Sequence, residues 1–238
     1  MEETLKISLP TSWDDITVSQ YCELLENDLK LGIINKVILT IKNDVDSITE
    51  LDEDEINKLF VTLSIILDID VDVINQIDID TLLYILQKLS WLGPVKVKNT
   101  LDINFRLLTT GTWIDIETII TNDISKNIPK FLTKLTNKDV SNESITKYYG
   151  LIDGFLNYRK KVYEDFGGLF NNDDDDSDED IKSSEELYRG SFNKKWNWYN
   201  FLYQLANENV LDMEKASELN MIHALNHFSF IKERGRLK

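Results

Sequence analysis

Apolar side chains recur every three or four residues along most of the chain, which is the spacing of an amphipathic helix. The clearest stripes lie in residues 51–67 and 77–92. Each of these segments opens with carboxylates, which suit the positive end of a helix dipole, and Asp78 or Asp80 is the expected cap of the second. Nearer the N-terminus, the sequence TSWDDIT predicts a helix start, followed by a helix over about 17–30.

Further helices are predicted in residues 109–122, 128–135, 141–166, 195–207 and 212–233. Thr112 is the expected cap of the first, Pro129 suits the first turn of the second, and Gly167-Gly168 is expected to end the third. Residues 33–41 are apolar and β-branched enough for either a strand or a buried helix. The helix signals on both sides of this stretch favour a helix.

Two places alternate apolar and polar residues in period two, the pattern of a half-buried strand. Residues 6–10 predict a short strand. Residues 95–107, which follow the helix-ending pair Gly93-Pro94, predict a two-stranded hairpin with its turn near Asn99-Thr100. The expected fold class is therefore mainly α: a helical body with a small β-hairpin, and a C-terminal helical hairpin.

A run of acid at residues 171–180 carries seven carboxylates and no basic side chain. Seven like charges repel one another and offer no apolar surface to bury, so this run predicts an acidic linker. The expected division is a helical body with short strands at 1–170, the acidic linker at 171–190 and a C-terminal helical hairpin at 191–238.

An internal echo suggests a further division of the helical body. The sequence W-x-D-I occurs at Trp13 and again at Trp113, each time after a candidate strand and a turn rich in Thr or Ser. The hypothesis is that the body consists of two related units, 1–92 and 93–170. In each unit the tryptophan would fix how the helix leaves its strand.

The composition is that of a globular protein with a large negative charge. The chain has 238 residues, of which 42% are hydrophobic, and a formal net charge of −16. Because a groove that follows nucleic-acid phosphates needs clustered Lys and Arg, we expect no nucleic acid as a partner. No stretch approaches 18 apolar residues and the N-terminus lacks a signal-peptide pattern, so we expect a soluble protein with no membrane partner.

Few residues are suited to catalysis or metal binding. The single cysteine, Cys22, lies in an apolar helical pattern and is expected to be a buried structural thiol. His223 and His227 have the i, i+4 spacing of a metal-binding pair, but no Glu lies between them and no third ligand is identifiable. Glycine-rich phosphate-binding motifs and the hydrolase elbow are missing. We therefore expect no enzyme, no cofactor, no metal and no small-molecule substrate.

The densest aromatic patch of the chain lies near residue 200. The residues that fit one helical face, and are expected in the core of the C-terminal hairpin, are Trp198, Phe201, Leu202 and Leu205. A hairpin of about forty residues buries little surface by itself, so the other aromatic side chains must meet either the body or another chain. The candidate partner-binding residues are therefore Trp196, Tyr199 and Tyr203.

The C-terminal segment WNWYNFLYQLANENVLDMEKASELNMIHALNHFSFIKERGR resembles the closing part of tailed-phage assembly proteins, in which an aromatic helix is followed by a polar turn and a second helix. The helix opening is matched by Val210 and Met213, and the final stretch by Leu225, Lys232 and Arg234. The segments LPTSWDDITVSQYCELLE and FRLLTTGTWIDIETII are similar to small virion-assembly proteins of the crAss-like and related phages of Bacteroidetes.

This resemblance implies a non-enzymatic virion structural or assembly protein of a tailed phage, in the neck or tail. Its expected partners are other phage structural proteins, and we expect it to be an oligomer or a subunit of a complex. It would be found in the virion, or in the host cytoplasm during assembly. The alternative is a tail-assembly chaperone, which holds a helical partner such as a tape measure and is absent from the mature particle. For a third class, a small enzyme with an acidic metal site, no ligand set with metal spacing is found.

Overall fold

The computed structural model describes residues 7–27, 52–95, 101–170 and 197–236. In these residues the chain is mainly helical, as predicted, and contains no strand. By its internal contacts the chain divides into two compact units, each built from two separate stretches of sequence: unit 1 is Met1–Asp102 with Asn122–Ile152, and unit 2 is Ile103–Thr121 with Asp153–Lys238.

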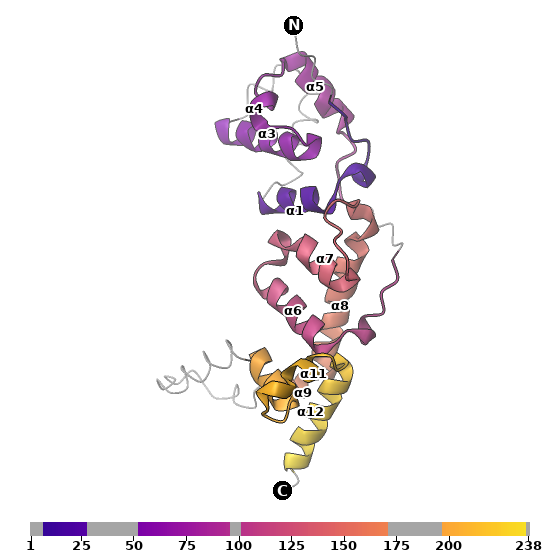
Figure 1. Ribbon diagram of the computed structural model, residues 1–238. Helices are drawn as coiled ribbons and strands as arrows, with labels where there is room; N and C mark the ends of the chain where they lie inside the picture. Colours follow the sequence, from indigo (N-terminus) through magenta and orange to yellow (C-terminus); the bar gives the residue numbers. More distant parts are fainter. Residues whose placement is uncertain (1–6, 28–51, 96–100, 171–196, 237–238) are drawn as a thin grey trace, which may run out of the picture. The chain divides into compact units, whose positions relative to one another are not determined.

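The described helices of unit 1 range from single turns to the 15 residues of α3 (Figure 1). In chain order they are η1 (Trp13–Asp15), α1 (Val18–Glu26), α3 (Glu53–Leu67), α4 (Val71–Ile74), α5 (Ile79–Lys88), η4 (Ile124–Lys126), α7 (Ile128–Thr136) and η5 (Ile145–Lys147). The long helix α8 (Tyr149–Asp165) begins in unit 1 and continues into unit 2.

Side chains at the helix N-termini explain where several of these helices begin. Thr17 and Gln20 form a capping box at α1, in which each side chain accepts the other's backbone N–H. Asp52 caps α3, and Asp78, one of the two predicted caps, accepts the N–H of Thr81 at 2.9 Å to start α5. The first turn of α7 contains a proline, as the sequence predicted.

The core of unit 1 forms around α1, which lies between α3 and α7 (Figure 1). The ring of Trp13 meets the rings of Trp91 and Tyr21 edge to face, with centroids 5.6 and 5.9 Å apart. The indole N–H of Trp13 donates to the carbonyl of Gly93 at 3.0 Å. Trp13 therefore fastens the N-terminal segment to the end of α5.

Backbone hydrogen bonds join the segment before α1 to the turn before α8. Ile145 N donates to Ile16 O, and Val18 N donates to Glu143 O, both at 2.9 Å. Thr17 and Ser144 lie between these hydrogen bonds and form an isolated antiparallel bridge. These contacts make residues 122–152 part of unit 1, although most of that unit lies far earlier in the sequence.

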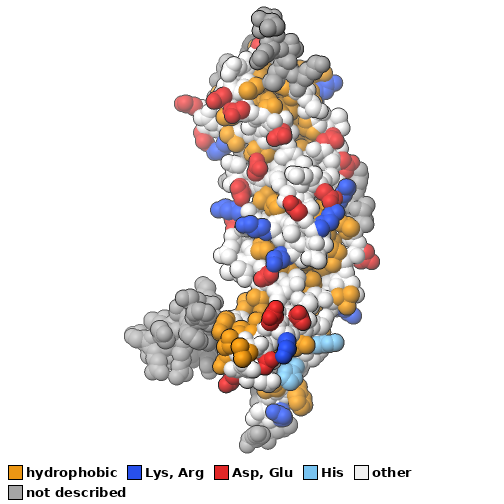
Figure 2. Space-filling model, viewed as in Figure 1, with side chains coloured by type: hydrophobic (Ala, Val, Ile, Leu, Met, Phe, Trp, Pro, Cys, Tyr) orange, Lys and Arg blue, Asp and Glu red, His pale blue; other side chains and the backbone are white. Residues whose placement is uncertain are grey.

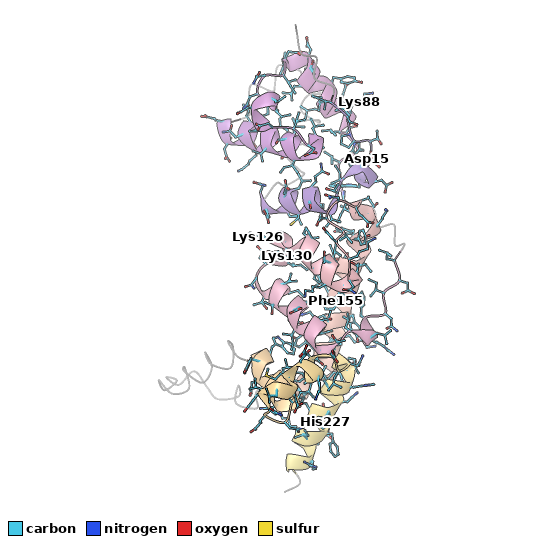
Figure 3. All side chains as sticks on the ribbon, in the orientation of Figure 1. Asp15, Lys88, Lys126, Lys130, Phe155 and His227 are labelled. Atoms are coloured by element: carbon cyan, nitrogen blue, oxygen red, sulfur yellow. The ribbon has the colours of Figure 1, made fainter. Side chains whose placement is uncertain are left out.

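Unit 2 is built around a cluster of aromatic rings. Its described elements are η3 (Phe105–Leu107), α6 (Thr110–Thr121), most of α8, α9 (Gly167–Phe170), a helix at 197–205, η6 (Val210–Asp212), α11 (Met213–Ser217) and α12 (Met221–Arg236). The rings of Trp113 and Phe155 lie 5.4 Å apart, and Phe105 contacts Phe155 edge to face at 5.6 Å. Figure 3 labels Phe155 on α8.

The predicted hairpin at 95–107 is not seen in the residues that the structure describes. Residues 101–104 form no strand, η3 occupies the end of the segment, and the expected turn at Asn99-Thr100 lies outside the described residues. The reason is that Phe105 turns into the aromatic cluster as a single anchor, so the segment buries one ring instead of one face of a ladder. Residues 7–10 of the predicted N-terminal strand also form no strand.

Several predicted helix ends differ from the observed ones. Helix α6 begins three residues before Trp113 and is capped by Thr109, whose hydroxyl accepts the N–H of Thr112, so Thr112 is not the cap. Helix α8 ends at Asp165, directly before the predicted stop at Gly167-Gly168, but it begins only at Tyr149, and the two glycines start the short helix α9. The predicted helix at 212–233 is two helices, α11 and α12, separated at residues 218–220.

Two predictions fall on residues that the structure does not describe, and the predicted division of the body differs from the observed units. The predicted helix at 33–41 and the acidic linker at 171–190 lie outside the described residues. The observed units are discontinuous in sequence, whereas the predicted units, 1–92 and 93–170, are continuous. Unit 2 joins residues on both sides of the acidic run, with α8 and α12 in the same unit.

Candidate protein-interaction surface

The C-terminal helices of unit 2 are held by the start of α6. Thr110 donates twice to the carbonyl of Leu219, from its N–H at 2.7 Å and from its hydroxyl at 2.9 Å. Met221 N donates to Leu108 O at 3.0 Å, and Thr109 and Asn220 form an isolated bridge. These bonds take up backbone groups that a continuous helix would use internally, which explains why α11 and α12 separate here.

Close packing reinforces this junction. A Cβ atom added at Gly111 would lie 3.1 Å from Ser217 Cβ and 3.3 Å from Ser217 O, so only glycine fits without displacement. On α12, the side chains of Met221, Ala224 and Leu225 are buried. The face of α12 that carries these residues is therefore fixed inward, and the opposite face is presented outward.

Large apolar side chains are exposed on the C-terminal helices of unit 2. We call the following set the C-terminal apolar residues: Leu211 (87% exposed), Val210 (61%), Phe230 (58%), Tyr199 (48%), Leu219 (47%) and Ile231 (40%). Figure 2 shows hydrophobic side chains gathered over these helices. An exposed Leu by itself is ordinary, but several on three elements and on the turn between α11 and α12 suit a surface that is covered by another protein.

The structure brings two of the three predicted partner-binding residues together. The rings of Tyr199 and Tyr203 stack with centroids 6.4 Å apart and an interplanar angle of 14°; Tyr199 is about half exposed and Tyr203 is half-buried. Trp196 lies outside the described residues. Phe201 packs against Phe228 of α12, with centroids 4.5 Å apart. The four predicted core residues, Trp198, Phe201, Leu202 and Leu205, are half-buried and are not among the fully buried side chains.

The other C-terminal apolar residues were missed by the sequence reasoning. Val210 was assigned to a helix opening, but it lies with Leu211 in the 3-10 turn η6. Phe230 was one of several apolar residues that surround α12 on all sides, more than a single buried stripe needs. That excess was the signal in the sequence that one face of α12 remains uncovered.

The outward face of α12 also carries polar and cationic groups. His223, His227 and Phe230 follow one another at spacings of four and three residues, and all three are exposed. Figure 3 labels His227 on this helix, and Figure 2 shows the histidine side chains at the surface. The guanidinium of Arg234 lies 5.7 Å from the centroid of the Phe230 ring. The face is therefore aromatic with a cationic end.

A second arrangement in unit 2 is structural in character. Arg159, Tyr163 and their neighbours line a hollow of about 490 Å³ on α8 and α9. The guanidinium of Arg159 is engaged by Glu117, which is only 3% exposed, and this hydrogen bonding raises the pKa of Arg159. Burial raises the pKa of the Tyr163 hydroxyl above its ordinary value. These groups are committed to one another, so the pair stabilises α6 against α8.

The residues first considered for chemistry occupy ordinary positions. Cys22 is buried, its Sγ lies 3.2 Å from the carbonyl of Ser125, and burial raises the pKa of its thiol. His223 and His227 are exposed, and the described part of the chain holds no group of three or more His, Cys, Asp or Glu that could bind a metal. None of the helices in the described ranges is long and apolar enough to cross a membrane.

Comparison of the chain with protein-family models, with curated proteins and with solved structures gives no match. The resemblance to tailed-phage assembly proteins therefore stays a hypothesis that depends on the sequence segments quoted above.

Proposed function

We propose that this chain is a non-enzymatic subunit of a tailed-phage neck or tail, or of the machinery that assembles them, and that it works through protein-protein contacts. The observation that carries the proposal is the exposure of the C-terminal apolar residues on and beside α12, whose opposite face is buried. The resemblance of the same segment to the closing part of phage assembly proteins supplies the class of partner.

The exposed area is large enough to matter for binding. Fully burying an exposed Val, Leu or Phe side chain contributes roughly 1.5–3 kcal/mol. Val210, Leu211 and Phe230 are 61%, 87% and 58% exposed, so covering all three would contribute about 3–6 kcal/mol. Association costs of similar size must be overcome, so these residues would act as anchors within a wider interface. The stacked pair Tyr199 and Tyr203 extends that interface along the helix at 197–205.

Mass spectrometry of purified phage particles tests the proposal. Recovery in a fixed ratio to the other structural proteins supports a virion subunit. Absence from the particle, with recovery from infected cells in a complex with a helical tail protein, supports the alternative role of a tail-assembly chaperone. If the chain is found neither in the particle nor in such a complex, the proposal is wrong.

A further inference from the structure

The outward side of η6, α11 and the turn that follows them forms one continuous face in unit 2. Exposed and shielded residues alternate in pairs from residue 210 to residue 219, a repeat of four that is close to the period of a helix. The exposed members, which we call the α11 face, are Val210, Leu211, Glu214, Lys215, Glu218 and Leu219. The residues between them are half-buried or buried. The α11 face therefore has apolar side chains at both ends and charged side chains between them.

The charge of the α11 face is negative. The ammonium group of Lys215 lies 3.1 Å from the carboxylate of Asp212, which neutralises the one cation of the face. Among the described residues, no cation is paired with the side chain of Glu214 or of Glu218. Two exposed carboxylates thus remain available to a cationic partner.

The outward face of α12 has the opposite character. Its exposed residues, which we call the α12 face, are His223, Asn226, His227, Phe230, Ile231 and Arg234. The guanidinium of Arg234 lies over the ring of Phe230 and makes no ion pair within the described part of the chain. The sequence of α12 contains three residues of Lys or Arg and a single carboxylate, Glu233, at the edge of this face. The α12 face is therefore aromatic and cationic.

The two faces are exposed at the same time in one compact unit. They do not cover each other within the chain, so a contact between them must join two chains. Each face offers large apolar side chains, and the charges of the two faces are opposite. These are the properties of surfaces that bind each other, with an apolar centre and complementary charge around it.

We propose that the α11 face of one copy of this chain packs against the α12 face of a second copy. Leu211 and Leu219 would cover the ring of Phe230, and Glu214 and Glu218 would lie opposite Arg234. This inference rests on the proposed function as a subunit and names the partner of the same surface as another copy of the chain. Because the two faces differ, the contact is heterologous, and repeating it produces a ring or a filament.

Paired charge reversals in the full-length protein test this contact. The first variant carries Glu214→Lys and Glu218→Lys, and the second carries His227→Glu and Arg234→Glu. Each variant alone should self-associate about tenfold more weakly than the wild type in sedimentation velocity at about 0.1 M salt, because it brings like charges together. An equimolar mixture should recover the association, since each contact between unlike variants again joins opposite charges.

The design separates the contact from a general effect of net charge. The first variant makes the chain less acidic and the second makes it more acidic, so net charge alone would change association in opposite directions. Asp153→Lys with Asp165→Lys is the matched control, because it changes the net charge as the first variant does, at exposed positions of α8. This control should not weaken self-association.

The melting temperatures of the reversal variants should stay close to that of the wild type, because every altered side chain is exposed. If a reversal lowers the melting temperature, the neutral pair Glu214→Gln with Glu218→Gln provides a second test. This pair should weaken self-association by a smaller factor, about threefold, with an unchanged melting temperature. An unchanged association in this variant would count against the contact.

Three results would overturn the inference. These are a wild-type protein that is monomeric over roughly 1–100 μM, association that both reversals leave unchanged, and single variants that do not recover when they are mixed. A monomeric chain that is nevertheless recovered in phage particles would lose this inference and keep the proposed function, because a different protein would then cover these residues. A self-associating chain that is absent from particles and tail complexes would lose the proposed function instead.

Discussion

The guanidinium of Arg159 and the carboxylate of Glu117 form a bidentate ion pair between α8 and α6. Arg159 Nε donates to Glu117 Oε1 at 2.6 Å, and Nη2 donates to Oε2 at 2.8 Å. The Arg159 guanidinium also lies 4.6 Å from the centroid of the Tyr163 ring. Glu117 is almost fully buried, whereas about a third of the Arg159 side chain reaches solvent.

This asymmetry predicts unequal costs for the two halves of the pair. Arg159→Met leaves a buried carboxylate without its partner and should lower the free energy of unfolding by about 3 kcal/mol. Glu117→Gln should cost less, because Arg159 can turn to water. Urea unfolding of both variants measures the difference. The double variant Glu117→Met with Arg159→Met should be more stable than Arg159→Met alone, and equal costs for the two single changes would contradict this account.

Glu143 predicts a loss of stability in acid. Hydrogen bonds from Lys138 and from the Tyr148 hydroxyl lower the pKa of Glu143 from 4.5 to about 2. A carboxyl whose pKa is lowered by folding stabilises the protein above its unfolded pKa, and this contribution is lost as the pH falls from about 4.5 to about 2. The difference in melting temperature between wild type and Glu143→Gln should be constant at neutral pH and shrink across that window.

Tyr148→Phe provides the control for that measurement. Removing the hydroxyl removes one of the two donors, so the pKa of Glu143 in the folded protein should rise. The pH range over which the stabilisation by Glu143 is lost should therefore become narrower. The ring keeps its buried position, so the core contact is preserved. An unchanged window in this variant would show that the Tyr148 hydroxyl has no part in holding the carboxylate charged.

Two glycines in unit 2 predict opposite effects on stability. Gly111→Val inserts a side chain against Ser217 and should lower the free energy of unfolding by about 1–3 kcal/mol. Gly154→Ala, in the interior of α8, places its Cβ 3.5 Å from the Phe105 ring, an ordinary contact, and should raise it by up to about 1 kcal/mol. Thermal unfolding checks both signs. If Gly111→Val were stabilising, α11 would have to shift away from Gly111 at little cost in free energy.

The C-terminal apolar residues predict a loss of partner capture without a loss of folding. Leu211→Ser with Phe230→Ser should weaken binding to the proposed partner by tenfold or more, which is about 1.4 kcal/mol, because both side chains are exposed in the free protein. Ile79→Ser with Tyr84→Ser, at 52% and 53% exposure in unit 1, is the matched control and should bind normally. Co-purification with particles or tail proteins measures both, and equal losses would remove the C-terminal helices as the docking surface.

Local chemistry made much of the helical organisation predictable. The stripes of α3 and α5, the cap at Asp78 and the proline in the first turn of α7 all depend on residues within a few positions of one another. Predictions from residues a few positions apart hold in the folded protein because neighbouring residues determine both the hydrogen bonds that begin a helix and the face that it buries.

The candidate site was predictable only in part. Tyr199 and Tyr203 follow from the excess of aromatic residues in one helix, and the structure stacks them. Leu211 and Phe230 do not, because periodicity shows where apolar residues recur but not which of them a distant segment covers.

By itself, the sequence determined a mainly helical chain, the positions of its main helices and its acidic charge. Tertiary structure decided how those helices group. The break between α11 and α12 depends on Thr110, which hydrogen-bonds to a carbonyl 109 residues further along the chain. Phe105 was read as part of a strand and became an anchor in a ring cluster, because the cluster forms only when α6 and α8 meet. Contacts between residues so far apart leave no periodic trace in the sequence, so only the folded chain reveals them.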